Sequence, residues 1–192
     1  NGQCGQGSTE RVGKLTVVEE LRGQVVTQIH AYNGCEHTLI VTQEGKLYSF
    51  GYNYRGQLGQ GSTSSIFSPR IVRGLESRKV VTVSCSYYHS VVSCATGEIF
   101  AFGRNDFGQL GLGDNTDRKE PTHVELPEAQ GEGARSIACG QYHTMIATAS
   151  GHAYAFGKND YGQLGLISNE CQRRPVRLEA PIFEDGGVAE FR

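Results

Sequence analysis

Three histidines, a residue type common in metal and acid–base sites, recur along the chain at a steady spacing. His37, His89 and His143 lie 52 and 54 residues apart, and each is followed by Thr or Ser. Metal ligands must converge within about 2 Å of one ion. Equivalent positions of successive repeated units are expected to diverge instead. The pattern therefore predicts no metal site, and each histidine is expected to bond to a neighbouring backbone group.

The cysteines add no signal for chemistry of their own. They are Cys4, Cys35, Cys85, Cys94, Cys139 and Cys171. No C-x-x-C pair occurs among them, which argues against a zinc ribbon or a redox motif. We interpret them as buried, reduced thiols, which favours an intracellular protein of the cytoplasm or nucleus. Neither G-x-S-x-G, H-E-x-x-H nor a Walker sequence occurs, so no catalytic residue and no cofactor is predicted. No apolar run approaches the roughly 20 residues that a membrane span needs.

A glycine-rich stretch, "GYNYRGQLGQG" at 51–61, has the composition of a phosphate-binding loop. It recurs as "GRNDFGQLGLG" at 103–113 and "GKNDYGQLGL" at 157–166, and its second half opens the chain at 2–7. A period of this kind predicts a structural corner of a repeated unit rather than a nucleotide site. The asparagines and glycines are expected at turn positions with positive φ, and the glutamines are expected to satisfy turn amides. These framework residues are Gly51, Asn53, Gly56, Gln57, Gly59, Gly103, Asn105, Gly108, Gln109, Gly111, Gly157, Asn159, Gly162, Gln163 and Gly165.

Short alternating segments surround each corner. Strands are expected near Ile29, at 38–42, at 47–50 and at the equivalent positions of the later units, because apolar residues there alternate with small or polar ones. Pro69, Pro121 and Pro175 are expected at the heads of edge strands, with Leu15 in the corresponding place of the first unit. Four short strands in about 52 residues predict an all-β chain, most simply a β-propeller.

These residues resemble the RCC1 (regulator of chromosome condensation) repeat family. The corners match its G-x-N-x-x-G-Q-L-G-x-G signature, and "CGQYHT" from Cys139 matches its C-G-x-x-H-[ST] segment, whereas Ser86 and Asn33 depart from it. The resemblance implies a seven-bladed propeller of which about half the ring is present. It assigns 1–181 to the repeats and 182–192 to a tail or the start of a further repeat. The rest of the ring is then expected from the same or another chain.

Recognition is expected where the corners vary from unit to unit on a constant frame. The predicted partner-binding side chains are Tyr52, Tyr54, Arg55, Arg104, Phe107, Lys158 and Tyr161. Tyr and Arg are enriched in binding hot spots, and successive corners should form an arc on one face of the ring. The alternative for Phe107 and Tyr161 is that they fold inward against the adjacent blade.

The resemblance implies a protein–protein interaction platform, within a larger multidomain regulator such as a ubiquitin ligase. The alternative is guanine nucleotide exchange on a small Ran-like GTPase, which the family associates with an inserted hairpin that these units lack. The net charge of −2 argues against general nucleic-acid binding. Two local basic groups keep DNA or chromatin as a weaker alternative: Arg70, Arg73, Arg78 and Lys79, and then Arg173, Arg174 and Arg177.

Overall fold

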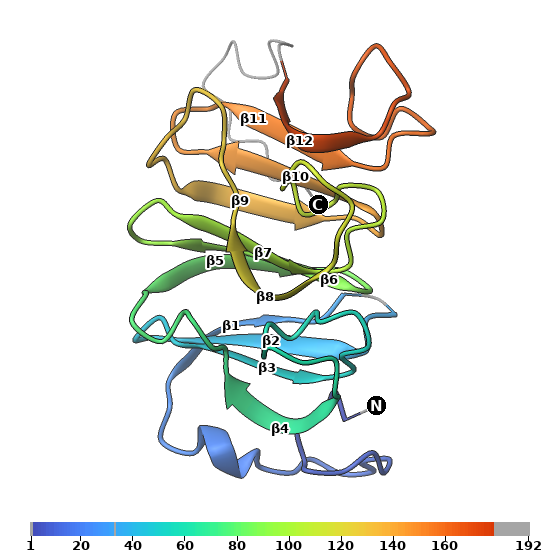
Figure 1. Ribbon diagram of the computed structural model, residues 1–192. Coiled ribbons are helices and arrows are strands. Elements are labelled where there is room, and N and C mark those ends of the chain that lie inside the picture. Colours follow the sequence, from blue (N-terminus) through green and yellow to red (C-terminus); the bar gives the residue numbers. More distant parts are fainter. Residues whose placement is uncertain (1, 33, 179–192) are drawn as a thin grey trace.

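The computed structural model describes residues 2–32 and 34–178, and they form three four-stranded sheets stacked one upon another (Figure 1). We call these sheets blades 1, 2 and 3. Blade 1 holds β1 (Val26–His30), β2 (His37–Thr42), β3 (Leu47–Gly51) and β4 (Ile66–Ile71). Blade 2 holds β5 (Val80–Cys85), β6 (His89–Cys94), β7 (Ile99–Gly103) and β8 (Arg118–His123). Blade 3 holds β9 (Ala134–Cys139), β10 (His143–Thr148), β11 (Ala153–Gly157) and β12 (Gln172–Arg177).

Each blade is an antiparallel meander in which consecutive strands are neighbours. A short 3-10 turn, η1 (Glu19–Leu21), precedes blade 1, and no other helix occurs in the described ranges. The prediction of an all-β chain with propeller-type blades is confirmed. None of the described residues forms a helix with the length and apolarity that crossing a membrane requires.

The hydrophobic core lies between the blades. One cluster joins residues of blade 1, including Leu39 and Leu47, to Val83 and Phe102 of blade 2. A second cluster joins blade 2 to blade 3 through side chains such as Ile146. A single blade therefore buries its faces only against its neighbours, as expected for a repeat architecture. The small residues on the second face of each third strand, Ser49, Ala101 and Ala155, are fully buried, so neighbouring groups pack closely there.

The prolines lie in the middle of the edge strands rather than at their heads. Pro69, Pro121 and Pro175 are the fourth residues of β4, β8 and β12. The pairing of each edge strand with its neighbour shifts register over this stretch. A bulge leaves one residue without a ladder bond, so a residue without an N–H group is tolerated there. The predicted position at the strand head was wrong, although the predicted edge location was right.

The segment around Leu15 forms no strand. Leu15 is fully exposed and Val17 is 56% exposed. The fourth strand of each blade pairs with the third strand, which precedes it in the chain: β4 with β3, β8 with β7 and β12 with β11. The first unit supplies no such partner for Leu15 within the described residues. The expectation that this segment parallels the proline segments was therefore wrong.

The interpretation of all six cysteines as buried thiols holds for only some of them. All six are free, but only Cys85, Cys94 and Cys139 are buried. Cys35 is half-buried, and Cys4 and Cys171 are exposed because they lie in loops outside the strands. Asn33 and the boundary between 181 and 182 lie outside the described residues.

Candidate binding surface along the blade corners

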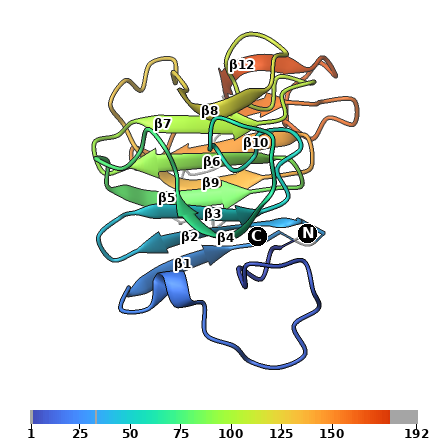
Figure 2. The ribbon, with the colours of Figure 1, turned by 60° about the horizontal axis from the view of Figure 1, so that its bottom comes forward.

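The corners are the loops that follow β3, β7 and β11, and they lie along one side of the molecule in both ribbon views (Figures 1 and 2). Each is organised by its asparagine. Asn53 Oδ1 accepts a hydrogen bond from the backbone N–H of Leu58 at 2.9 Å, and its Nδ2 donates to the carbonyls of Ser62 and Ser64. Asn105 repeats this arrangement in the second corner. The asparagines are fully buried cross-links of the loop.

The expected positive φ of the asparagines was wrong. Among the described residues, the non-glycine residue with positive φ is Glu128, whereas the corner glycines do adopt positive φ. Side-chain hydrogen bonding to the loop, and not tolerance of left-handed backbone, is therefore what this position needs. The expected role of the glutamines is confirmed, because Gln57 Oε1 accepts from Arg55 N at 3.0 Å and Gln109 Oε1 from Phe107 N at 2.9 Å.

The first two corners also pack on the following blade. A Cβ placed on Gly59 would lie 3.0 Å from the ring of Phe102, and one on Gly111 would lie 2.9 Å from that of Phe156. At Gly165, the equivalent residue of the third corner, nothing described lies within 4 Å. The first two corners therefore join successive blades. In the third corner, the equivalent surface around Gly165 has no described neighbour.

The histidines form a second connection between blades. His37 Nε2 lies 3.0 Å from Ser90 Oγ in blade 2, and this hydroxyl donates to the carbonyl of Gln57 at 2.9 Å. The hydroxyl of blade 2 is thus held between two groups of blade 1. We call this arrangement the histidine latch.

The latch recurs between blades 2 and 3. His89 Nε2 lies 3.0 Å from Thr144 Oγ1, which donates to the carbonyl of Gln109 at 2.8 Å. The expectation that the histidines bond to neighbouring backbone was therefore wrong for His37 and His89, because the partner of each is a side chain of the next blade. The Ser or Thr after each histidine was the available signal. Burial lowers the pKa of His89 to about 3, so the latch contains a neutral imidazole.

Aromatic and cationic side chains form one continuous series of ring contacts across the corner side of the three blades. We call this series the aromatic arc. Its members are Tyr32, Tyr87, Tyr88, Tyr52, Tyr54, Arg104, Tyr142, Phe107, Lys158 and Tyr161. The tyrosine rings of blades 1 and 2 have centroids 6.1 to 6.3 Å apart.

Two cations connect the rings. The guanidinium of Arg104 lies 5.6 Å from the centroid of Tyr88 and 5.0 Å from that of Tyr142. Lys158 Nζ lies 5.0 Å from Phe107 and 5.9 Å from Tyr161. These separations fall within the range of cation–π attraction. Positive charge therefore lies between ring faces in the part of the arc that spans blades 2 and 3.

Acidic side chains hold these cations in place. Asp106 lies 2.5 Å from both Arg55 and Arg104, so it joins the first corner to the second. Asp160 lies 3.1 Å from Lys158, and this hydrogen bond raises the pKa of the lysine. Ion pairs this exposed contribute little to stability. Their main effect is to order these long side chains.

The seven predicted recognition residues are brought to one region, although not all of them are equally open. Tyr54 and Tyr161 are 67% and 89% exposed, whereas Phe107 is half-buried with its ring 5.2 Å from Tyr142 of blade 3. The alternative prediction, that the side chain folds inward against the adjacent blade, is thus right for Phe107 and wrong for Tyr161. Arg55 joins the arc through Asp106 rather than through a ring.

Sequence reasoning missed Tyr87, Tyr88 and Tyr142. Tyr87 and Tyr88 precede His89 in "SYYHS", and Tyr142 precedes His143 in "QYHT". The contacts above place Tyr88 and Tyr142 beside corner residues of the preceding blade. A tyrosine directly before two of the three repeated histidines, His89 and His143, was the signal that could have found Tyr88 and Tyr142.

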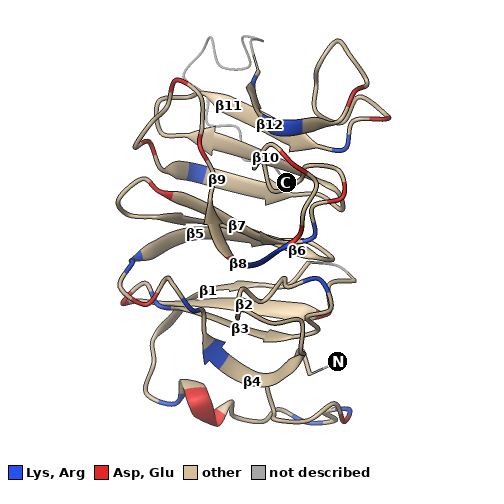
Figure 3. Cartoon of the chain, viewed as in Figure 1, with Lys and Arg blue, Asp and Glu red and all other residues tan. Residues whose placement is uncertain are grey.

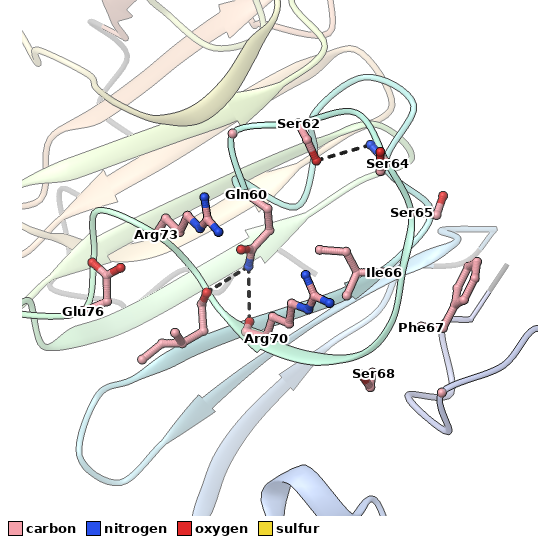
Figure 4. A pocket seen from close by; sticks show the side chains of 13 residues that line it. Gln60, Ser62, Ser64, Ser65, Ile66, Phe67, Ser68, Arg70, Arg73 and Glu76 are labelled. Atoms are coloured by element: carbon pink, nitrogen blue, oxygen red, sulfur yellow. Dashed lines mark hydrogen bonds between the residues drawn. The ribbon is translucent and has the colours of Figure 1, made fainter.

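The two basic groups do not each form a continuous patch. Arg78 pairs with Glu98 and Arg177 with Glu128, while Arg70 and Arg73 line a groove of about 840 Å³ beside β4 (Figure 4). Figure 3 shows basic and acidic residues interspersed over the three blades on the side in view. The groove walls are largely polar, and Gln60 crosses it to donate to the backbone of the edge strand.

Family comparison accounts for the repeat. The model described as "Regulator of chromosome condensation (RCC1) repeat" matches residues 44–93, 96–147 and 150–185. The first match begins before β3 and ends in β6, so each sequence repeat holds the end of one blade and the beginning of the next. Because the sequence repeat is offset from the blade, each repeat contributes strands to two neighbouring blades and links them through the chain.

Several curated proteins are similar to the chain. Protein RCC2 of Homo sapiens is 39% identical over 149 residues, which are 78% of this chain and 28% of that protein. Ultraviolet-B receptor UVR8 of Arabidopsis thaliana is 34% identical over 93% of this chain and 40% of its own length. The X-linked retinitis pigmentosa GTPase regulator of Homo sapiens is 36% identical over 80% of this chain and 15% of its own. The chain thus spans well under half of these relatives.

Solved structures agree on the fold. Human WBSCR16 superposes with a TM-score of 0.73 at 27% identity, over 84% of this chain and 42% of that one. Prp20p from Saccharomyces cerevisiae superposes with a TM-score of 0.70 at 22% identity, over 94% and 45%. With the repeat model matching most of its length and three blades of the expected form, the chain belongs to the RCC1 repeat family.

Proposed function

We propose that the chain is a non-catalytic protein-interaction platform that docks another protein on its aromatic arc. The observation that supports this most is the continuity of the arc, in which ring contacts run across three blades. Tyrosine and arginine supply large, ordered contact area, and they dominate binding hot spots. Loops held on a rigid scaffold are also where recognition residues concentrate.

The platform is proposed to work as part of a larger propeller. The unmatched joining surface at Gly165, together with relatives more than twice as long, favours further blades from the same or another chain. A larger multidomain regulator, such as a ubiquitin ligase, is the setting we propose. An intracellular location, in the cytoplasm or nucleus, accords with six free thiols.

A pull-down of partners from a native extract tests the arc. In the test variant, Tyr52, Arg55, Arg104 and Lys158 are changed to Ala; in the control variant, Arg70, Arg73, Lys79 and Val81 are changed to Ala. The proposal expects partners to be lost from the first variant and kept by the second, with both melting temperatures measured. Retention of every partner by a folded arc variant contradicts the assignment of this surface.

A second candidate is guanine nucleotide exchange on a Ran-like GTPase. It is favoured by the structural likeness to Prp20p, whose structure is described together with its binding to Gsp1p and histones. A GDP-release assay on the full-length protein distinguishes the two functions. Rapid, protein-dependent release supports exchange, whereas unchanged release at high protein concentration rejects it. Binding of histones in the pull-down would instead favour a chromatin partner.

A further inference from the structure

Three soft ligand atoms meet at the boundary between blades 1 and 2. Cys35 Sγ, His37 Nδ1 or Nε2 and Cys85 Sγ all lie within 4.8 Å of one another, and no other such group of three occurs in the part of the chain that the structure describes. His37 begins β2 and Cys35 lies two residues before it, whereas Cys85 ends β5. The group combines non-equivalent repeat positions, so the argument that repeated histidines diverge does not apply to it.

The histidine latch fixes which nitrogen faces the sulfurs. Ser90 has one hydroxyl proton, and it is donated to the carbonyl of Gln57, which can only accept. Ser90 Oγ must therefore accept from His37 Nε2–H, at 3.0 Å. In a neutral imidazole this leaves Nδ1 with a free lone pair, and Nδ1 lies 2.9 Å from Cys35 Sγ. A second hydrogen bond that orients the ring in this way is characteristic of metal-binding histidines.

Electron-rich atoms crowd the Cys35 sulfur. Besides His37 Nδ1, the carbonyl oxygens of His37 and Ser86 lie 3.2 and 3.1 Å from it. A thiol has one proton, so it can serve only one of these three acceptors well. A bound cation, unlike that single proton, can be coordinated by several electron-rich atoms at once.

The donor set selects the kind of ion. Two thiolates and an imidazole favour thiophilic ions such as Zn²⁺ and Cu⁺ over Mg²⁺ or Ca²⁺. With Zn–S of about 2.3 Å and Zn–N of about 2.0 Å, ligand atoms on a tetrahedral ion lie about 3.5–3.8 Å apart. Cys35 Sγ and His37 Nδ1 lie 2.9 Å apart, and all three ligand atoms lie within 4.8 Å of one another, which is the scale of that spacing. Three protein ligands would leave a fourth position for water.

We propose that Cys35, His37 and Cys85 bind one thiophilic d¹⁰ cation, with Zn²⁺ as the first choice, across the boundary between blades 1 and 2. The equivalent latch of blade 2 is a natural comparison within the chain. There the atom beside the histidine Nδ1 is the hydroxyl of Ser86, 2.7 Å from His89. The thiol of blade 1 is therefore a feature of this position and not of the repeat.

The test uses tag-free, fully reduced protein, stripped with a chelator and titrated with Co²⁺ and Zn²⁺. The proposal expects one Co²⁺ per chain with a thiolate-to-cobalt charge-transfer band, and its displacement by one Zn²⁺. Cys35→Ser should weaken binding by about 100-fold or more. This variant should also keep the fold, because Ser86 occupies the corresponding place beside His89.

Matched variants control for folding and for unrelated thiols. Cys171→Ser removes an exposed cysteine outside the group and should leave metal affinity unchanged. His37→Gln and His89→Gln each break one latch, but only His37→Gln should weaken metal binding. A Cu⁺ titration against a competing chelator identifies the ion: stoichiometric uptake of Cu⁺ without Zn²⁺ assigns copper and keeps the site. Absence of uptake of either ion by reduced protein overturns the proposal, as does a cobalt band that survives Cys35→Ser.

Discussion

His37 Nε2 and Ser90 Oγ lie 3.0 Å apart although 53 residues and a blade boundary separate them in the chain. The same relationship joins His89 to Thr144. Blades 1 and 2 thus each hold a hydroxyl of the next blade inside a buried site, so the latch connects structural units that otherwise meet through apolar packing.

Ser90→Ala should destabilise the protein by about 1–3 kcal/mol, because it leaves the His37 N–H group and the Gln57 carbonyl without their partner in a buried site. Ser90→Thr is the control, since Thr144 fills the same place in blade 3. Denaturant unfolding measures both. Equal stability of the Ala and Thr variants would show that the latch hydroxyl contributes little.

Stability should fall as the pH drops below about 6.5. The folded-state pKa of His89 is lowered to about 3 by burial, and burial also lowers the pKa of His30 and of His143. Between those limits the unfolded chain binds protons that the folded chain cannot, so stability is complete above pH 6.5 and is lost toward pH 3. We expect a loss of about 1 kcal/mol per pH unit from His89.

Thermal unfolding between pH 7.5 and 5 checks this window, where most carboxylates remain ionised. His89→Gln should show a shallower dependence than the parent over the same range. A profile that is flat from pH 7.5 to 5 in the parent protein would contradict a neutral, buried His89.

Gly111→Val should destabilise by roughly 2–4 kcal/mol. Its φ is +73°, and a Cβ would lie 2.9 Å from the ring of Phe156. Gly165→Val is the matched control, because φ there is +69° but nothing described lies within 4 Å. The control carries only the backbone cost of about 1–2 kcal/mol. Equal losses would mean that contact between corner and blade adds nothing to the strain.

Phe107→Ser and Tyr161→Ser should separate packing from recognition. Phe107 packs against Tyr142, so its loss should lower the melting temperature. Tyr161 is 89% exposed, so its replacement should change stability by no more than about 0.5 kcal/mol. If the arc binds the partner, Tyr161→Ser should weaken binding about tenfold, which a direct binding titration measures. Unchanged affinity in this variant would place the partner elsewhere on the arc.

Much of the fold follows from local pattern. Alternation in segments such as 47–50 sets the strands, because neighbouring side chains of a strand point to opposite faces. The spacing of Gly51, Gly103 and Gly157 sets the unit. The role of Gln57 was also readable, since its hydrogen bond reaches only two residues along the chain.

The tertiary structure alone decided which residues meet across blades. The latch of His37 with Ser90, the stacking of Arg104 on Tyr142 and the approach of Cys85 to Cys35 join residues of different blades. Sequence period places equivalent residues one blade apart. Whether they diverge or touch depends on how far each sheet is rotated on the previous one and on which side chains fill the space between. That arrangement is fixed by the packing of the whole interface between blades, and no local stretch of the sequence encodes it.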